Sequence, residues 1–125
     1  MSKYTACKFS QSLSYSVKGL KVGYKSQRNF RTQITVGIVA GILAILLKFS
    51  VLEFCFVLVA ISLVLICELF NSVIEFVLDA VYKNKHSKLV GFAKDMSAGA
   101  VLIATVSSII IGIILYGSKI FALIQ

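Results

Sequence analysis

Three long apolar stretches dominate the chain and predict helices that cross a membrane. One runs from about Val51 to Ile66 and continues into a more polar segment, and a second runs from about Ala98 to Tyr116. A third, from Ile34 to Phe49, is shorter and contains Lys48, whose long side chain can reach the interface. Because about 20 helical residues cross a hydrocarbon core of roughly 30 Å, the pattern predicts membrane helices over about 31–49, 51–80 and 94–117.

The N-terminal segment has a different pattern, that of an amphipathic helix at the membrane surface. Its apolar residues recur at helical spacing, and three lysines form a separate stripe: the apolar set is Phe9, Leu13, Val17, Leu20 and Tyr24, and the basic set is Lys18, Lys21 and Lys25. Residues 1–30 are therefore predicted to hold a surface helix, either a simple anchor or a helix that also contributes groups to a cytoplasmic site. With no repeat and no proline, residues 1–125 are predicted to form one all-α membrane domain.

Charge and composition agree with this architecture and predict its orientation. At 58% hydrophobic residues, the chain is too apolar for a soluble globular protein of 125 residues. Basic residues gather before the first span and between the second and third, whereas only Lys48 and Lys119 fall on the other side. The positive-inside rule then places the N-terminus in the cytoplasm and the C-terminus outside. This topology and anionic lipid headgroups account for the net charge of +8 better than the alternative, nucleic-acid binding.

The segment CELFNSVIEFVLD, residues 67–79, holds three of the five acidic residues of the chain. Each helical residue advances about 100°, so Glu68, Asn71, Glu75 and Asp79 fall on one face of the predicted helix. A charge near membrane depth costs several kcal/mol unless it is paired or hydrated, so an acid there indicates a functional site. The three cysteines, Cys7, Cys55 and Cys67, are widely spaced and are predicted to be reduced packing residues.

The start of the third span adds a lysine that can meet this acidic face. Lys94 and Asp95 lie in AKDMSAGAVL, residues 93–102, and Lys94 can bind a phosphate as a point charge near a positive helix end. Acids that hold a divalent cation, a phosphate-binding lysine and a deep carboxylate, Glu68, that acts as a base are the parts that phosphoryl transfer needs. No GxxxxGK motif is present, so a nucleotide would bind without a P-loop.

Two other interpretations of the acidic face stay open from the residues alone. Glu75 and Asp79 can be interfacial groups that are solvated or paired with Lys83 and Lys94, although Glu68 lies about two turns deeper. A proton relay or a small transporter subunit also uses acids within the membrane. Such a protein would not need all of these acids near its basic cytoplasmic side.

Three motifs together resemble the small prokaryotic diacylglycerol kinase family, which includes undecaprenol kinases. They are YSVKGLKVGYKSQRNFR (15–31), ELFNSVIEFVLD (68–79) and AKDMSAGAVLI (93–103), and the resemblance extends from about Phe9 to Leu115. The resemblance implies a homotrimer of three-span subunits in the bacterial inner membrane, with sites shared between neighbours. It also implies that ATP and Mg²⁺ are used to phosphorylate the hydroxyl of a lipid substrate, diacylglycerol or undecaprenol, at the cytoplasmic interface.

The resemblance assigns roles to individual positions. Glu68 corresponds to the general base, and Glu75 to a carboxylate that binds both the metal and ATP. Asn71 and Ser97 correspond to positions that line the site on the substrate side. The other ATP-binding positions are Tyr15, Gln27, His86, Lys94 and Asp95.

Gln27 departs from the family pattern. The family often has a glutamate here, as a second metal carboxylate. A glutamine keeps an oxygen ligand but removes a negative charge, so metal affinity falls unless the ATP phosphates complete the coordination. This departure motivates the non-enzyme alternative, a catalytically silent family member that acts as an assembly or lipid-binding subunit.

Overall fold

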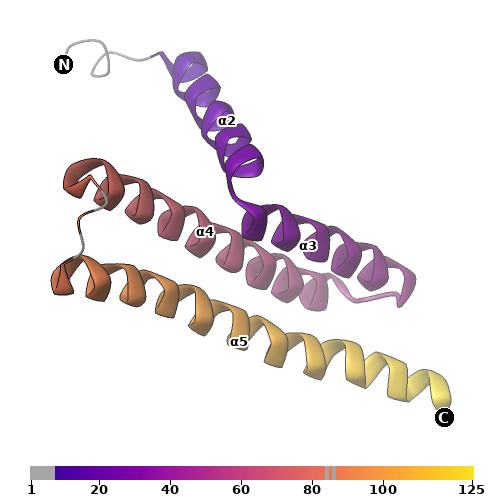
Figure 1. Cartoon of the computed structure of the whole chain (residues 1–125). Coiled ribbons are helices and arrows are strands. Elements are labelled where there is room, and N and C mark those ends of the chain that lie inside the picture. The colour runs from indigo at the N-terminus through magenta and orange to yellow at the C-terminus, as the bar shows by residue number, and fades with distance from the viewer. Residues whose placement is uncertain (1–7, 84, 86) are drawn as a thin grey trace.

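The computed structural model describes residues 8–83, 85 and 87–125, and this part of the chain forms four helices without any strand (Figure 1). Three of these helices, α3, α4 and α5, are long and apolar enough to cross a membrane. The predicted all-α class, with an N-terminal helix followed by three spanning helices, is confirmed. The helices are α2 (Phe9–Ser26), α3 (Arg28–Leu46), α4 (Val51–Tyr82) and α5 (Lys88–Ile124).

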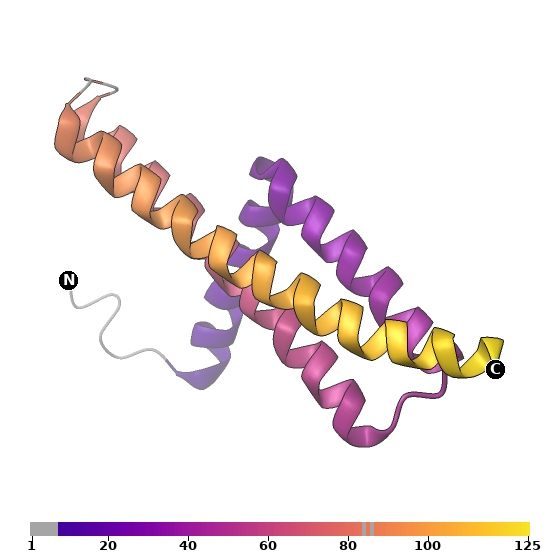
Figure 2. The same ribbon diagram turned by 90° about the horizontal axis from the view of Figure 1, so that it is seen from below.

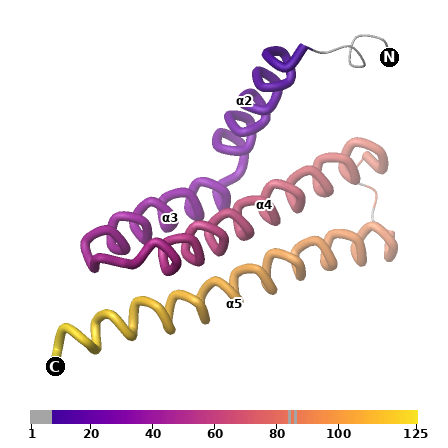
Figure 3. The backbone as a smooth tube through the Cα atoms, turned by 180° about the vertical axis from the view of Figure 1, so that it is seen from behind, coloured from indigo at the N-terminus to yellow at the C-terminus, as the bar shows by residue number. Residues whose placement is uncertain are grey.

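Helix α4 lies at the centre, with α3 along one side and α5 along the other (Figures 1 and 3). Each neighbour runs antiparallel to α4, so the α3–α4 turn and the C-terminus lie at the same end of the molecule (Figure 2). Helix α2 leaves α3 at an angle and projects away from the other three helices, as expected for a helix at the membrane surface. Helix α5 begins at Lys88 and ends at Ile124, so it extends beyond the predicted span 94–117 at both ends.

The buried stripe of α4 explains how the three long helices pack. Five buried residues recur every three or four positions along this helix, as one face of an α-helix requires. On the neighbouring helices, Phe30 and Ala44 of α3 and Ala104 of α5 are also buried. The stripe contains apolar residues first and then two polar ones: Val57, Ala60, Val64, Glu68 and Ser72.

Polar and aromatic contacts join the α3–α4 turn and the start of α4 to α5, at the end of the molecule opposite to the acidic residues 68–79. Ser50 and Glu53 form a capping box at the start of α4, and Glu53 also pairs with Lys119 of α5 at 3.1 Å. The Phe49 and Tyr116 rings lie 4.7 Å apart between centroids. These contacts connect the α3–α4 turn to the last turns of α5, and the sequence pattern did not predict them.

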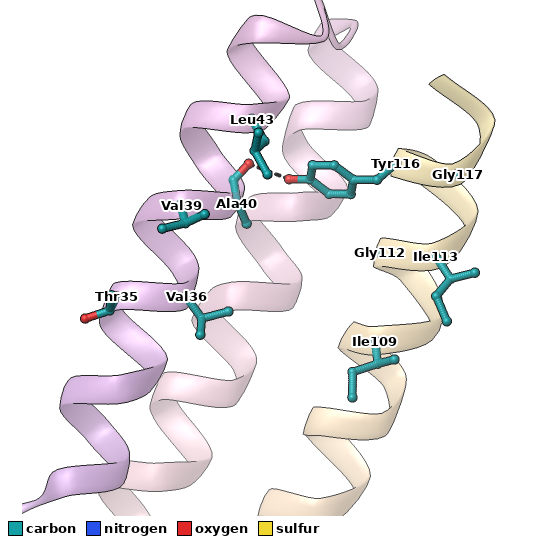
Figure 4. A pocket seen from close by; sticks show the side chains of 10 residues that line it. All are labelled: Thr35, Val36, Val39, Ala40, Leu43, Ile109, Gly112, Ile113, Tyr116 and Gly117. Atoms are coloured by element: carbon teal, nitrogen blue, oxygen red, sulfur yellow. Dashed lines mark hydrogen bonds between the residues drawn. The ribbon is translucent and has the colours of Figure 1, made fainter. Parts of the chain in front are cut away.

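Helices α3 and α5 enclose an open apolar pocket of about 690 Å³ (Figure 4). Val36 and Val39 line it from α3, and Ile109 and Ile113 line it from α5. The Tyr116 hydroxyl crosses this space and donates a hydrogen bond to the backbone carbonyl of Ala40. The residues that line it carry no charge.

Small residues let helices pack closely, and five of them on α3 and α5 were compared: Gly37, Gly41, Ala98, Gly99 and Ala100. Of these five, only Gly37 makes a close contact with another helix of the same chain. A Cβ atom on Gly37 would lie 2.8 Å from Cγ2 of Ile61, whereas Gly41 and Gly99 have open space around the same position. Ala98 and Ala100 are exposed. Gly37 therefore sets the separation of α3 from α4.

We predict that Gly37→Ala destabilises the protein relative to Gly41→Ala. The added methyl group meets a β-branched side chain close to its backbone, and overpacking of this kind costs about 1–3 kcal/mol. Alanine gains about 1 kcal/mol of helix propensity at either position, so Gly41→Ala should be neutral or stabilising. Unfolding by SDS in detergent micelles, followed by circular dichroism, measures the difference; equal stability of the two variants would contradict the contact.

Candidate functional site

Four polar residues in the second half of α4 share one face of the helix: Glu68, Asn71, Glu75 and Asp79. Glu68 is buried with 5% exposure, and Asn71, Glu75 and Asp79 are half-buried. The 32 residues of α4 span about 48 Å at 1.5 Å per residue, which exceeds a hydrocarbon core of roughly 30 Å. A core of this thickness measured from Glu53 ends between Glu68 and Glu75.

Glu68 belongs to the packed core and lies beside the α2–α3 bend. Among the described residues, no group donates a hydrogen bond to its carboxylate, while its backbone carbonyl accepts one from Ser72 Oγ at 2.9 Å. The next residue, Leu69, meets α2 at Gly23, where a Cβ atom would lie 2.9 Å from Leu69 Cδ2. Among the described residues no fully buried side-chain oxygen lacks a partner, so the Glu68 carboxylate keeps a small exposed surface. A largely buried acid with an open side is a candidate for chemistry.

A chain of hydrogen bonds connects the acidic face to the start of α5. Asn71 Nδ2 donates to Glu75 Oε1 at 3.3 Å, and Ser97 Oγ lies 2.6 Å from Asn71 Oδ1. The same Ser97 hydroxyl lies 2.9 Å from the backbone carbonyl of Lys94. Asn71 therefore lies between a carboxylate of its own helix and a hydroxyl of the neighbouring helix.

Lys94 is paired with Asp79 at 2.7 Å, which is one of the arrangements left open from the sequence. Both side chains stay partly exposed, at 37% for Lys94 and 45% for Asp79. An ion pair in such a setting contributes about 0–1 kcal/mol to the free energy of folding. Exchanging Asp79 for a phosphate as the partner of Lys94 would therefore cost little. The neighbouring Asp95 is exposed, because successive residues of a helix point about 100° apart.

Two further predicted site residues belong to α2 and to the bend that follows it. Tyr15 is 47% exposed on α2, with Lys18 Nζ 5.8 Å from the centroid of its ring. Gln27 is half-buried at the bend between α2 and α3, where its backbone N–H donates to the Gly23 carbonyl at 2.9 Å. His86 lies outside the described residues.

The bend at Gln27 is held by a side chain that the sequence interpretation did not single out. The Arg31 guanidinium donates hydrogen bonds to the backbone carbonyls of Tyr24 and Lys25, at 2.8 and 3.0 Å. These carbonyls belong to the last turn of α2, where backbone acceptors have no partner within the helix. Arg31 thereby fixes the direction in which α2 leaves α3.

The donor set fits a magnesium ion that arrives with a nucleotide better than a resident metal. Among the described residues, no group of three His, Cys, Asp or Glu side chains is close enough to hold a metal ion. Mg²⁺ commonly uses one or two carboxylates together with substrate phosphates and water. Glu75 can supply such a carboxylate, and Gln27 can supply only a neutral amide oxygen.

Comparison with known proteins identifies the family of this chain. Residues 14–116 match the family described as Prokaryotic diacylglycerol kinase. The chain is 35% identical to a diacylglycerol kinase of Escherichia coli K12 over 104 residues, which cover 83% of this chain and 84% of the relative. It is 30% identical to an undecaprenol kinase of Bacillus subtilis over 112 residues, 90% of each.

A third relative is longer than this chain. The chain is 33% identical to a diacylglycerol kinase of Synechocystis over 101 residues, which cover 81% of this chain and 58% of that protein. The matched region includes the acidic face of α4 and the start of α5 in the family comparison. The chain therefore belongs to the prokaryotic diacylglycerol kinase family, a family of membrane lipid kinases.

Proposed function

We propose that this protein transfers the γ-phosphate of ATP to the hydroxyl group of a membrane lipid at the cytoplasmic interface. The observation that carries the proposal is the polar face of α4, which begins at the buried Glu68 and reaches Lys94 through Asp79. A lipid hydroxyl lies near the edge of the hydrocarbon core, whereas a nucleotide stays in water. The face spans both depths, and membership of the family supports the same assignment.

In the proposed reaction, Glu68 accepts the proton of the lipid hydroxyl as its oxygen attacks the γ-phosphorus of ATP. A new bond forms between this oxygen and phosphorus, the bond to the bridging oxygen breaks, and ADP leaves with its electron pair. Lys94 exchanges Asp79 for a phosphate oxygen. Glu75 and Gln27 would hold Mg²⁺, which neutralises charge on the phosphates when it is bound.

We propose that the working unit is a homotrimer whose subunits share their sites. Tyr15 and Asp95 are both expected in the nucleotide site, yet both are exposed in one chain, Tyr15 on the projecting helix α2. A neighbouring subunit can bring such residues to the acidic face. Extensive exposed apolar surface on α3, α4 and α5 is consistent with contacts between subunits.

The proposed orientation puts the acidic face on the cytoplasmic side. Basic residues are concentrated before α3 and between α4 and α5, at the end of the molecule that carries Glu75 and Asp79. By the positive-inside rule this end faces the cytoplasm, where ATP is available. The Glu53–Lys119 pair then lies at the opposite interface.

An assay with defined acceptors tests the proposal. The purified protein in mixed micelles receives labelled ATP and Mg²⁺ with diacylglycerol, undecaprenol or no lipid, and the labelled lipid is separated by thin-layer chromatography. We expect transfer to diacylglycerol or undecaprenol, the acceptors in the names of the relatives, and none without lipid. Absence of transfer to either lipid, with intact trimers, would favour the silent assembly subunit that Gln27 suggests.

A further inference from the structure

The bend between α2 and α3 consists of a single residue. Helix α2 ends at Ser26, α3 begins at Arg28, and Gln27 between them has an extended backbone with φ −117° and ψ 108°. Such a link fixes the point at which the two helices meet. It does not fix the angle between them, because the backbone dihedrals of the linking residue can still rotate. Contacts outside the link must therefore set this angle.

Packing of α2 against the membrane-spanning helices is concentrated in its last turns. Gly23 is the one buried residue of this helix, and a Cβ atom there would lie 2.9 Å from Leu69 Cδ2 and 3.5 Å from Phe30 Cδ1. Beside this contact, an apolar pocket of about 440 Å³ lies between Leu20 of α2 and Leu65 of α4. Packing alone would therefore let α2 swing about its C-terminal end.

Arg31 ties the two sides of the bend together. Its guanidinium Nη1 donates hydrogen bonds to the carbonyls of Tyr24 and Lys25, at 2.8 and 3.0 Å, and its backbone N–H donates to the Gln27 carbonyl at 3.2 Å. The two N–H groups of Nη1 have fixed directions in the guanidinium plane, so the two bonds to α2 also fix the orientation of this plane. The positive charge is also favourable at the negative C-terminal end of α2.

The angle of α2 determines where its predicted nucleotide-binding residue lies. Tyr15 precedes Tyr24 by nine residues, which is about 14 Å along a helix. A rotation of about 20° at the bend would displace Tyr15 by about 5 Å, more than the length of a hydrogen bond. Gln27 lies within the bend and would turn with it.

We propose that Arg31 is a positioning residue for nucleotide binding, because it holds α2 and the bend at one angle to the membrane-spanning helices. The inference rests on the proposed function, which assigns Tyr15 and Gln27 to the ATP site. With the tie in place, every molecule presents α2 at the productive angle. Without it, only a fraction of the molecules would do so at any moment, and the apparent affinity for ATP would fall by that fraction.

Arg28 provides a matched control for this inference. It lies one turn before Arg31 on α3 and is exposed, and its side chain forms no hydrogen bond or ion pair with any residue that the structure describes. Arg28→Ala therefore removes the same charge close to the same place and leaves the bend tied. An effect that came only from lost positive charge near the ATP phosphates would appear in both alanine variants.

The angle of α2 can be measured independently of activity. Double electron–electron resonance reports the distance between spin labels at Gln11→Cys on α2 and Leu46→Cys on α3, two exposed positions. The full-length protein is used in nanodiscs, with the native cysteines replaced by alanine and labelled subunits diluted into unlabelled ones. We expect one narrow distance distribution for the parent protein and for Arg28→Ala, and a broad one for Arg31→Ala. Arg31→Lys, which keeps the charge without the planar group, should be intermediate.

The KM for ATP should follow the width of the distance distribution. Arg31→Ala loses two hydrogen bonds, so its KM for ATP should rise at least about 5-fold. Its kcat at saturating ATP should stay within a few-fold of the wild type, because Glu68 lies on α4. An unaltered distribution in Arg31→Ala, equal broadening in Arg28→Ala, or a broad distribution with an unaltered KM for ATP would each overturn the inference.

Failure of this inference differs from failure of the proposed function. A wild-type protein that binds no ATP analogue and phosphorylates no lipid would overturn the proposed function, and the inference with it. An active wild-type protein with an unaltered Arg31→Ala variant would overturn the inference alone. If Arg31→Ala does not fold, as judged by circular dichroism, Arg31→Lys decides. Its distribution should be broader and its KM for ATP higher than in the parent protein, and unaltered values would overturn the inference.

Discussion

Replacing Glu68 with glutamine should lower the rate of lipid phosphorylation by about 10²- to 10⁴-fold, the usual contribution of a general base. The affinity for MgATP should stay nearly unchanged, because Glu68 lies in the core stripe of α4, two turns deeper than Glu75. Glutamine has almost the same shape but cannot accept the proton of the lipid hydroxyl. Lipid phosphorylation at saturating substrates and equilibrium binding of an ATP analogue measure the two quantities separately.

Glu53→Gln is the matched control for this prediction. It makes the same substitution in the same helix, at the far end, where Glu53 pairs with Lys119 and caps α4 with Ser50. It should reduce stability slightly and leave the rate of phosphorylation within a few-fold of the wild type. If Glu68→Gln kept full activity, or lost activity only through unfolding, the assignment of Glu68 as the base would be wrong.

The second large effect is expected at Glu75, where glutamine should weaken binding of MgATP at least about 10-fold. Loss of a partner behind a metal ligand already costs about 10- to 100-fold in metal affinity, and Glu75 is proposed as the ligand itself. The arrangement offers little compensation, because Gln27, the other proposed ligand, has no charge. Titration of an ATP analogue at fixed Mg²⁺ measures the effect, and excess Mg²⁺ should partly reverse it.

The comparison of Glu68→Gln with Glu75→Gln separates the two proposed roles. The first variant should bind MgATP and fail in the transfer step, and the second should fail to bind. Equal loss of nucleotide affinity in both variants would show that the polar face acts as one binding surface without a division between base and metal ligand. Unaltered affinity in Glu75→Gln would remove this residue from the metal site.

The depth of each group in the membrane gives this division its physical basis. Measured from Glu53, a hydrocarbon core of roughly 30 Å includes Glu68 and ends before Glu75 and Asp79. A lipid hydroxyl lies near the edge of the hydrocarbon core, whereas a triphosphate stays in water. A kinase that acts on both needs polar groups at the edge of the core and beyond it. A single long helix supplies them at a spacing of 3.6 residues per turn.

The sequence by itself determined the features that depend on neighbours within one helix. The lengths of the apolar runs predicted three spans, and helical periodicity placed Glu68, Asn71, Glu75 and Asp79 on one face. Local spacing is sufficient for such predictions because backbone hydrogen bonds set the rise and rotation of each residue. Family motifs added roles, which remain proposals for the individual residues.

Only the tertiary structure decided which groups meet across helices. The pairing of Lys94 with Asp79, the bond from Ser97 to Asn71 and the contact of Gly23 with Leu69 each join different helices. The register between two helices follows from how their whole surfaces pack, and many registers are compatible with the same apolar pattern. Spacing along the chain therefore cannot tell whether Lys94 is free or paired, or which side chain of α4 Ser97 hydrogen-bonds.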